Sequence, residues 1–102
     1  MNMGNMNALM QQAQKLQRDM EKKQNEIKSA EFTGESQLVN VVLMGDKTLK
    51  SIEFKNIDSL DSEDLEMLQD MIKIAHDDAI KKINAEIETK MGPYAKQLGG
   101  LI

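Results

Sequence analysis

A seven-residue period runs through the first thirty residues and constrains the secondary structure there. Apolar and small side chains fall in two heptad registers three residues apart: Met3 and Met10 in one, and Met6, Ala13, Met20 and Ile27 in the other. Apolar spacings of three and four predict an amphipathic helix with a narrow apolar seam. Strong helix formers dominate residues 5–29, and neither Gly nor Pro interrupts them. We therefore expect a helix over 5–29.

The apolar seam of this helix admits two interpretations. Gln17 and Gln24 occupy seam positions, which disfavours a long independent coiled coil. We favour a seam that packs in a subunit interface or a helix–helix interface. The alternative is a flexible methionine surface that docks a partner helix, since Met side chains adapt to irregular surfaces.

The middle of the chain has the composition of antiparallel strands. Residues 37–44 are rich in β-branched and aliphatic side chains on both faces, and residues 48–54 alternate with Ile52 and Phe54 expected to face inward. Gly45 supplies turn chemistry between them, which predicts a hairpin over 37–54. Residues 30–36 add a short first strand with a bend at Gly34. The antiparallel strands thus occupy residues 30–55.

A second helix is predicted over residues 61–91. Asp61 is a good N-cap, and acidic residues follow it in the first turn, where they favour the positive end of the helix dipole. Apolar residues then recur at helical spacing from Leu65 to Ile83. The pair Gly92-Pro93 is expected to end the helix, which leaves 92–102 as a mobile tail. The sequence predicts one α+β domain over 1–102, a two-layer helix–three-strand–helix subunit.

The composition favours self-association in the cytoplasm. The chain has 102 residues but only three aromatic side chains, two Phe and one Tyr, so a single subunit has few large groups with which to build a core. We expect a homodimer that buries more apolar area than one chain does. Cysteine is absent, which excludes disulfides and thiolate sites. No apolar run is long enough to span a bilayer, so we expect a soluble protein without a membrane partner.

Catalytic templates are poorly matched. The one histidine, His76, is followed by Asp77 and Asp78, but consecutive residues on a helix point about 100° apart and do not converge on one ion. No Gly-rich loop has phosphate-binding spacing. We expect no enzyme activity, no metal, no cofactor and no small-molecule substrate.

The distribution of charge is more informative than the net charge of −4. Residues 1–30 carry five basic and three acidic side chains, whereas residues 56–79 carry one basic and eight acidic ones. Residues 80–102 are again mildly basic, with four Lys and two Glu. The molecule is therefore acidic in the middle of its sequence and basic toward both ends.

The basic residues of the first helix form a stripe opposite the apolar seam. Lys15, Arg18 and Lys22 are spaced i, i+3 and i+7, so they share one outward face. An ordinary solvated face is one interpretation, and contact with nucleic-acid phosphates is the other. One Arg limits base reading, and Phe32 and Phe54 are expected to be buried, which leaves no stacking platform for single strands. The pattern favours duplex DNA bound through its backbone with limited sequence specificity.

These considerations give two sets of candidate residues. The candidate DNA contacts are Lys15, Arg18, Lys22, Lys23, Lys81, Lys82 and Lys90. The candidate dimer and core residues are Met6, Met10, Ala13, Met20, Val41, Leu43, Leu68 and Ile72.

Three segments together resemble the YbaB/EbfC family of bacterial nucleoid-associated proteins. The first helix is similar to the family's "KQAQKMQxxM" helix at Gln12, Ala13, Gln14, Lys15, Leu16, Gln17 and Met20. The hairpin is similar at Leu38, Val39, Val41, Gly45, Ile52 and Phe54, and the second helix at Asp61, Glu63, Asp64, Glu66, Leu68, Asp70, Ile72, Ala75, Asp78 and Ala79. Gln69 and Asp77 depart from the family pattern, which has an acid and Asn there.

The resemblance implies a tight homodimer whose protruding helices grip DNA in the nucleoid, without catalysis and with limited sequence preference. It also implies a role in chromosome organisation and gene regulation. A different function stays open on the residues alone. An acidic adaptor dimer would use the Met-rich helix and the acidic segment 56–79 to bind a basic protein.

Overall fold

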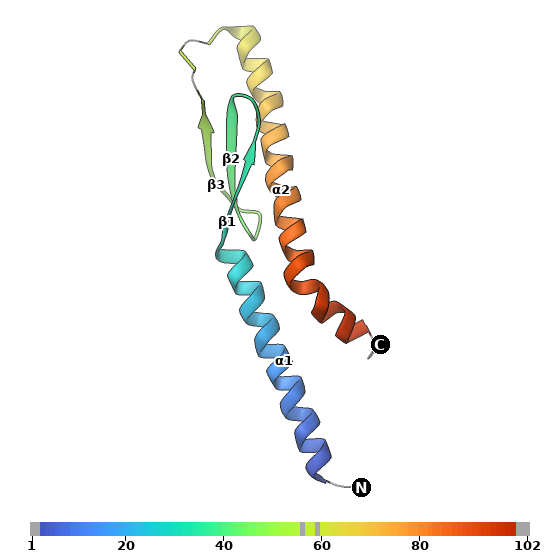
Figure 1. Ribbon diagram of the computed structural model, residues 1–102. Helices are drawn as coiled ribbons and strands as arrows, with labels where there is room; N and C mark the ends of the chain where they lie inside the picture. Colours follow the sequence, from blue (N-terminus) through green and yellow to red (C-terminus); the bar gives the residue numbers. More distant parts are fainter. Residues whose placement is uncertain (1–2, 56, 59, 100–102) are drawn as a thin grey trace.

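The computed structural model describes residues 3–55, 57–58 and 60–99 (Figure 1). A long helix α1 (Met3–Ser29) leads into strands β1 (Glu31–Glu35), β2 (Val39–Met44) and β3 (Leu49–Phe54), and the helix α2 (Ser62–Gly99) follows. The strands form one antiparallel sheet in the order β1-β2-β3. The α+β class and the helix–three-strand–helix order predicted from the sequence are confirmed.

The core lies between α2 and the sheet. Val39, Val41 and Leu43 of β2 point toward α2, and each is no more than 1 % exposed. They pack against a stripe of α2 made of Leu68, Ala75, Ala79 and Ile83. The alternation of the strand and the three-and-four spacing of the helix bring these two apolar faces together. The structure thus places Val41, Leu43 and Leu68 in the core, with Ile72 half-buried beside it.

Two glycines permit close contacts between backbones. A methyl group at Gly34 would lie 2.5 Å from the backbone nitrogen of Ala79 and closer still to the carbonyl oxygen of Ala75. At Gly45 it would overlap the backbone of Ile27, at the end of α1. The predicted bend at Gly34 is wrong, because this residue lies within β1. Position 34 has no room for a Cβ because α2 crosses the strand there, and position 45 has none because the end of α1 lies against the hairpin turn.

Strand β3 is less covered than its alternation predicts. Phe54, Ile52 and Leu49 pair with Val39, Val41 and Leu43 and share their face of the sheet. They are nevertheless 54 %, 37 % and 52 % exposed, so the expectation that Phe54 and Ile52 are buried is wrong for the single chain. Within the sheet, helix α2 packs mainly against β1 and β2, so the side chains of β3 stay largely exposed. The strand pattern specifies which side chains share a face, but not how far a helix extends across that face.

The two ends of α2 differ in how well the sequence predicts them. Asp61 Oδ1 accepts hydrogen bonds from the N–H groups of Glu63 (2.9 Å) and Asp64 (3.0 Å), while Asp64 Oδ2 accepts one from the Asp61 N–H (3.1 Å). This reciprocal arrangement is a capping box with Asp in both positions, so the predicted N-cap is confirmed.

The predicted end of α2 at residue 91 is wrong, because the helix continues through Pro93 to Gly99. A proline ring usually clashes with the Cβ of the residue before it and excludes that residue from helical geometry. Gly92 has no Cβ, which removes that contact with the proline ring, and the helix continues past Pro93 without the hydrogen bond that proline cannot donate. Residues 92–99 are therefore helical rather than a tail, and residues 100–102 of that expected tail lie outside the described residues.

The molecule is elongated. Its extents are 76 × 21 × 14 Å, and its radius of gyration is 20.8 Å, against about 13 Å for a compact domain of this length. In Figure 1 the N-terminal half of α1 projects beyond the sheet and beyond the end of α2. The fold therefore presents α1 to solvent as an arm.

Candidate nucleic-acid interface

Helix α1 carries the basic stripe on its solvent side. Lys15, Arg18 and Lys22 are all exposed, and in the part of the chain that the structure describes none of them forms an ion pair. Ile27, on the opposite side of α1, is 4 % exposed and lies near α2. The helical period thus orients the arm. The seam side of α1 faces α2 near the sheet, and the three basic side chains of the stripe face away from α2.

Beyond Lys22, the face of α1 that carries the stripe is no longer basic. A shallow hollow follows this face of α1, and Glu21 and Glu26 line it together with Arg18 and Lys22. Ser29, at the end of the hollow, donates its hydroxyl hydrogen to the Asn25 carbonyl oxygen at 2.9 Å, so that donor is occupied by the helix backbone. The basic side chains of this face therefore lie between Lys15 and Lys22, and only acidic or uncharged side chains line the rest of the hollow.

The other predicted basic residues are not gathered beside this stripe. Lys23 is half-buried on the seam side of α1. Helix α1 approaches α2 through Gln24, Ile27 and Lys28, which line a pocket of about 340 Å³ with Ile87 and Met91. Since this side of α1 is opposite the stripe, one chain does not bring Lys81, Lys82 or Lys90 next to Lys15, Arg18 and Lys22.

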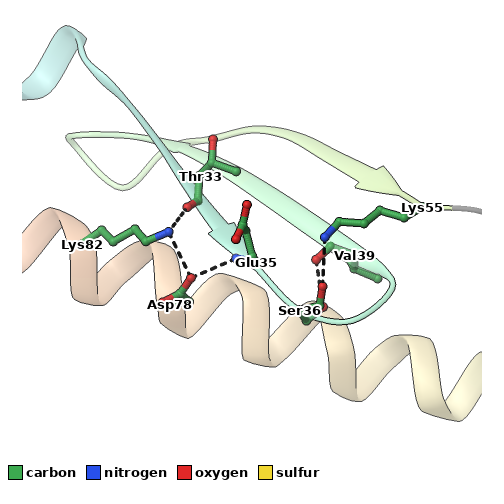
Figure 2. Close-up of polar contacts among 7 residues, drawn as sticks. All are labelled: Thr33, Glu35, Ser36, Val39, Lys55, Asp78 and Lys82. Carbon is green, nitrogen blue, oxygen red and sulfur yellow. Dashed lines mark hydrogen bonds and ion pairs between the residues drawn. The ribbon is translucent and has the colours of Figure 1, made fainter.

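Two of the three α2 lysines have partners within the chain. Lys82 Nζ lies 2.7 Å from the Thr33 carbonyl oxygen and 3.3 Å from Asp78 Oδ2 (Figure 2). Lys90 Nζ lies 3.3 Å from Glu86 Oε1. Lys81 is exposed and, among the described residues, forms no ion pair. Of these three, Lys81 is the most available to an external anion.

Asp78 is a structural residue that sequence reasoning about function overlooked. Its Oδ2 atom accepts a 3.0 Å hydrogen bond from the Glu35 N–H. This backbone bond and the neighbouring Lys82 ammonium lower the pKa of Asp78 below its usual value. The i, i+4 spacing of Asp78 and Lys82 was the available signal, because such pairs share one helix face. Together they attach α2 to the outer edge of β1.

The apolar seam is exposed along the arm. Met6, Leu9 and Met10 are 53 %, 64 % and 58 % exposed, Ala13 is exposed, and Met20 is half-buried. Among the described side chains of α1, Ile27 alone is buried. The seam therefore contributes little to the core of one chain.

Metal binding and membrane insertion have little support in the residues that the structure describes. His76 Nδ1 lies 3.6 Å from Asp77 Oδ1, and no group of three or more acidic or histidine side chains in these ranges is arranged to hold a metal ion. Neither helix, over the residues described, has the length and apolar character needed to cross a membrane.

Comparisons with known proteins cover nearly the whole chain. The family model described as the YbaB/EbfC DNA-binding family matches residues 3–98. A nucleoid-associated protein of Enterococcus faecalis is 43 % identical over 100 residues, which covers 96 % of this chain and 95 % of that protein. Nucleoid-associated proteins of Lactococcus lactis subsp. lactis and Streptococcus suis are 46 % and 45 % identical over 98 residues, which cover 94 % of this chain and 98 % of each relative. The chain belongs to the YbaB/EbfC DNA-binding family.

Proposed function

We propose that this protein is a nucleoid-associated protein that binds duplex DNA as a homodimer, with limited sequence specificity, in the bacterial cytoplasm. Its role would be to organise the chromosome and influence gene expression. The observation that carries the proposal is the exposed stripe of Lys15, Arg18 and Lys22 on a projecting helix. Membership of a DNA-binding family and the names of the relatives support the same conclusion.

The spacing of the stripe suits contact with a phosphate backbone. At 1.5 Å per helical residue, Lys15 and Lys22 are about 10 Å apart along the helix axis. One DNA strand rises by about 3.4 Å per nucleotide along the duplex axis, so the three basic side chains together span roughly three nucleotides along that axis. Lys is a point charge that neutralises phosphate without reading a base, whereas Arg is the side chain best suited to guanine. One Arg among the three supports binding with little sequence selection.

The aromatic side chains do not supply a second mode of binding. Phe54 is exposed on β3, while Phe32 and Tyr94 are half-buried on other elements, β1 and α2. Stacking on single strands needs aromatic groups in succession along a basic groove. Backbone contact with a duplex therefore remains the mode that these residues support. A homodimer doubles the three contacts of one arm to six, a number that gives a steep dependence on salt.

Mobility-shift titrations of a charge-reversed protein test this proposal. The variant Lys15→Glu/Arg18→Glu/Lys22→Glu should lose affinity for all duplexes about equally. If all six contacts of a dimer are removed, the slope of log K against log salt should fall by roughly five. The charge-conserving variant Lys15→Arg/Lys22→Arg is the matched control and should bind with nearly parental affinity.

Three results would contradict the assignment. Parental binding that does not change between low and high salt would exclude phosphate contact as the source of affinity. Loss confined to particular sequences would show that the stripe reads bases. A protein that binds no duplex, but recovers a basic protein from lysate after nuclease treatment, would support the acidic adaptor instead.

A further inference from the structure

Helix α1 is fixed to the rest of the chain at its base, residues 24–30. Ile27 is 4 % exposed and is the only buried side chain of α1 among those that the structure describes. Lys28 lines the pocket that this base shares with α2. Toward the N-terminus Met10 is 58 % exposed, and that half of the helix projects beyond the sheet and beyond α2 (Figure 1). The direction of the basic stripe is therefore set largely by contacts at the base of the arm.

The β2–β3 turn, residues 45–48, lies against this base through Gly45. Gly45 is buried, and its N–H donates a hydrogen bond to the Ala30 carbonyl oxygen at 3.0 Å. The Ala30 N–H donates in turn to the Ile27 carbonyl oxygen at 3.1 Å. A Cβ at position 45 would lie 3.0 Å from the Lys28 backbone nitrogen and would overlap the Ile27 carbonyl group. Only glycine allows the turn to approach the end of the helix this closely.

The turn is held in place by its own hydrogen bonds. The Met44 N–H donates to the Thr48 carbonyl oxygen at 2.8 Å, and the Lys47 N–H donates to the Met44 carbonyl oxygen at 2.8 Å. The Thr48 N–H also donates to Asp46 Oδ1 at 2.9 Å. Lys47 has a φ of 72°, in the left-handed region that side chains other than glycine rarely adopt, so these bonds outweigh a local strain. The turn is thus a firm support for α1.

A small displacement at the base becomes a large one along the arm. Ile27 lies about 4.5 Å from Ala30, where α1 joins β1, and Lys15 lies about 22 Å from it along the helix. A shift of about 1 Å at Ile27 is a rotation of roughly 13° about Ala30, which moves Lys15 by about 5 Å. That distance exceeds the rise of about 3.4 Å between successive nucleotides of one DNA strand. The contact between Ile27 and Gly45 therefore controls which phosphates the stripe can reach.

We propose that Gly45 is a positioning residue for DNA binding, because it lets the end of α1 lie against the turn and so fixes the direction of the basic arm. This inference rests on the proposed function and adds to it a residue that carries no charge and lies outside the stripe. An arm that is already directed loses less conformational entropy when Lys15, Arg18 and Lys22 contact phosphates together. An arm that is displaced loses some of those contacts.

Gly45→Ala tests the role in DNA binding without changing any charge of the chain. The Ile27 carbonyl oxygen must move by at least about 1 Å to reach the 3.0 Å that real Cβ contacts keep, so the arm must rotate. If each arm loses one of its three contacts, the slope of log K against log salt should fall by roughly two. At about 0.1 M salt the affinity should then fall roughly 10- to 100-fold. A Gly45→Ala protein with parental affinity and parental slope would overturn the proposal.

Val42→Ala is a control that separates positioning from stability. Val42 is 8 % exposed and, by the alternation of β2, points to the face of the sheet opposite α2. Its truncation removes buried methyl groups and lowers Tm, but it places no new atom against α1. At a temperature where circular dichroism shows both variants folded, Val42→Ala should bind DNA as the parent does. An equal loss of affinity in the two variants would show that affinity follows stability, and would overturn the proposal.

The direction of the arm is measurable apart from DNA binding. Because the chain has no cysteine, spin labels can be attached at Gln12→Cys on α1 and Asn84→Cys on α2, both exposed positions. Labelled chains are diluted into an excess of unlabelled chains, so that a labelled dimer carries one pair. Gly45→Ala should shift the distance between the labels by up to about 6 Å, and Val42→Ala should leave it unchanged. Reduced affinity of Gly45→Ala with an unchanged distance would overturn the proposal.

Ile27→Ala decides the matter if Gly45→Ala does not fold. This variant removes the side chain that anchors the arm and introduces no overlap, so the distances should spread over a wider range and the salt slope should fall. Parental distances together with parental affinity would overturn the proposal. A parent that binds no duplex would refute the proposed function itself, whereas a displaced Gly45→Ala arm with parental affinity would refute only the positioning role of Gly45.

Discussion

Replacing Gly34 with Ala should separate α2 from the sheet. The added methyl group would lie 2.5 Å from the Ala79 backbone nitrogen and closer still to the Ala75 carbonyl oxygen. Both are backbone atoms of a helix, so no side chain can rotate to make room. The helix must withdraw by about 1 Å before that oxygen reaches the 3.0 Å that real Cβ contacts keep, and a close-packed core resists such a shift.

The size of the effect follows from the contacts that move. A radial gap of about 0.5–1 Å forfeits a quarter to a half of each dispersion contact, and Ala75 and Ala79 lie in the middle of the core cluster. Overpacking typically costs about 1–3 kcal/mol, and a rigid backbone neighbour favours the upper end. Alanine recovers about 0.5–1 kcal/mol relative to glycine in a strand. We expect a net loss of about 2–2.5 kcal/mol in the free energy of unfolding.

Thermal unfolding followed by circular dichroism measures this loss. At about 4–8 °C per kcal/mol for a domain of this size, Tm should fall by roughly 10–20 °C. Thr33→Ala, at the neighbouring exposed position of β1, is the control and should change stability by less than about 1 kcal/mol. Both variants should be compared at one protein concentration, because dimerisation raises apparent stability. A Gly34→Ala protein that melts within about 3 °C of the parent would refute the close approach of α2 to β1.

Two further predictions concern Asp78 and Lys82, which attach α2 to the outer edge of β1. The hydrogen bond from the Glu35 N–H and the neighbouring Lys82 lower the pKa of Asp78 in the folded state. The stability that this carboxylate provides is therefore fully present above its unfolded-state pKa of about 3.9. That stability is lost as the pH falls through the lower folded-state pKa. The difference in urea midpoint between the parent and Asp78→Ala should therefore be full at pH 7 and shrink below about pH 4; a difference that is constant down to pH 2 would contradict this. In a mobility-shift titration, Lys81→Ala should lower DNA affinity more than Lys82→Ala does, because the Lys82 ammonium already contacts Thr33 and Asp78. Equal losses of affinity would show that these intramolecular contacts do not restrain Lys82.

The elements with strong local signals are predictable from the sequence. The heptad period places α1 at Met3–Ser29, close to the expected 5–29, and Asp61 caps α2 as expected. These features depend on residues within a few positions of one another, where spacing specifies geometry. The end of α2 was missed because the effect of Pro93 depends on its neighbour. Gly92 has no Cβ and so removes one of the contacts that usually make proline end a helix.

Long-range packing is not predictable in the same way. The alternation of β3 identifies Ile52 and Phe54 as members of the α2 face, but the position of α2 over β1 and β2 decides that they stay exposed. Gly34 carries no local signal for the helix that crosses it. Likewise, the charge pattern identifies Lys82 as basic but not the carbonyl oxygen of Thr33, 49 residues earlier, that it contacts. Each of these outcomes depends on a segment distant in the sequence.

The exposed apolar surface links the stability of this fold to its assembly. The buried core comprises a few aliphatic residues at the junction of α2 with β1 and β2, while Leu9, Met10, Leu49 and Phe54 are more than half exposed. Burial of apolar area contributes about 25 cal/mol per Å², so a chain that leaves these groups in water forgoes a substantial part of the stabilisation available to it. Self-association would recover that part only when a second copy binds. Stability would then rise with protein concentration, and the arms that carry Lys15, Arg18 and Lys22 would be held at a fixed separation only in the assembled dimer.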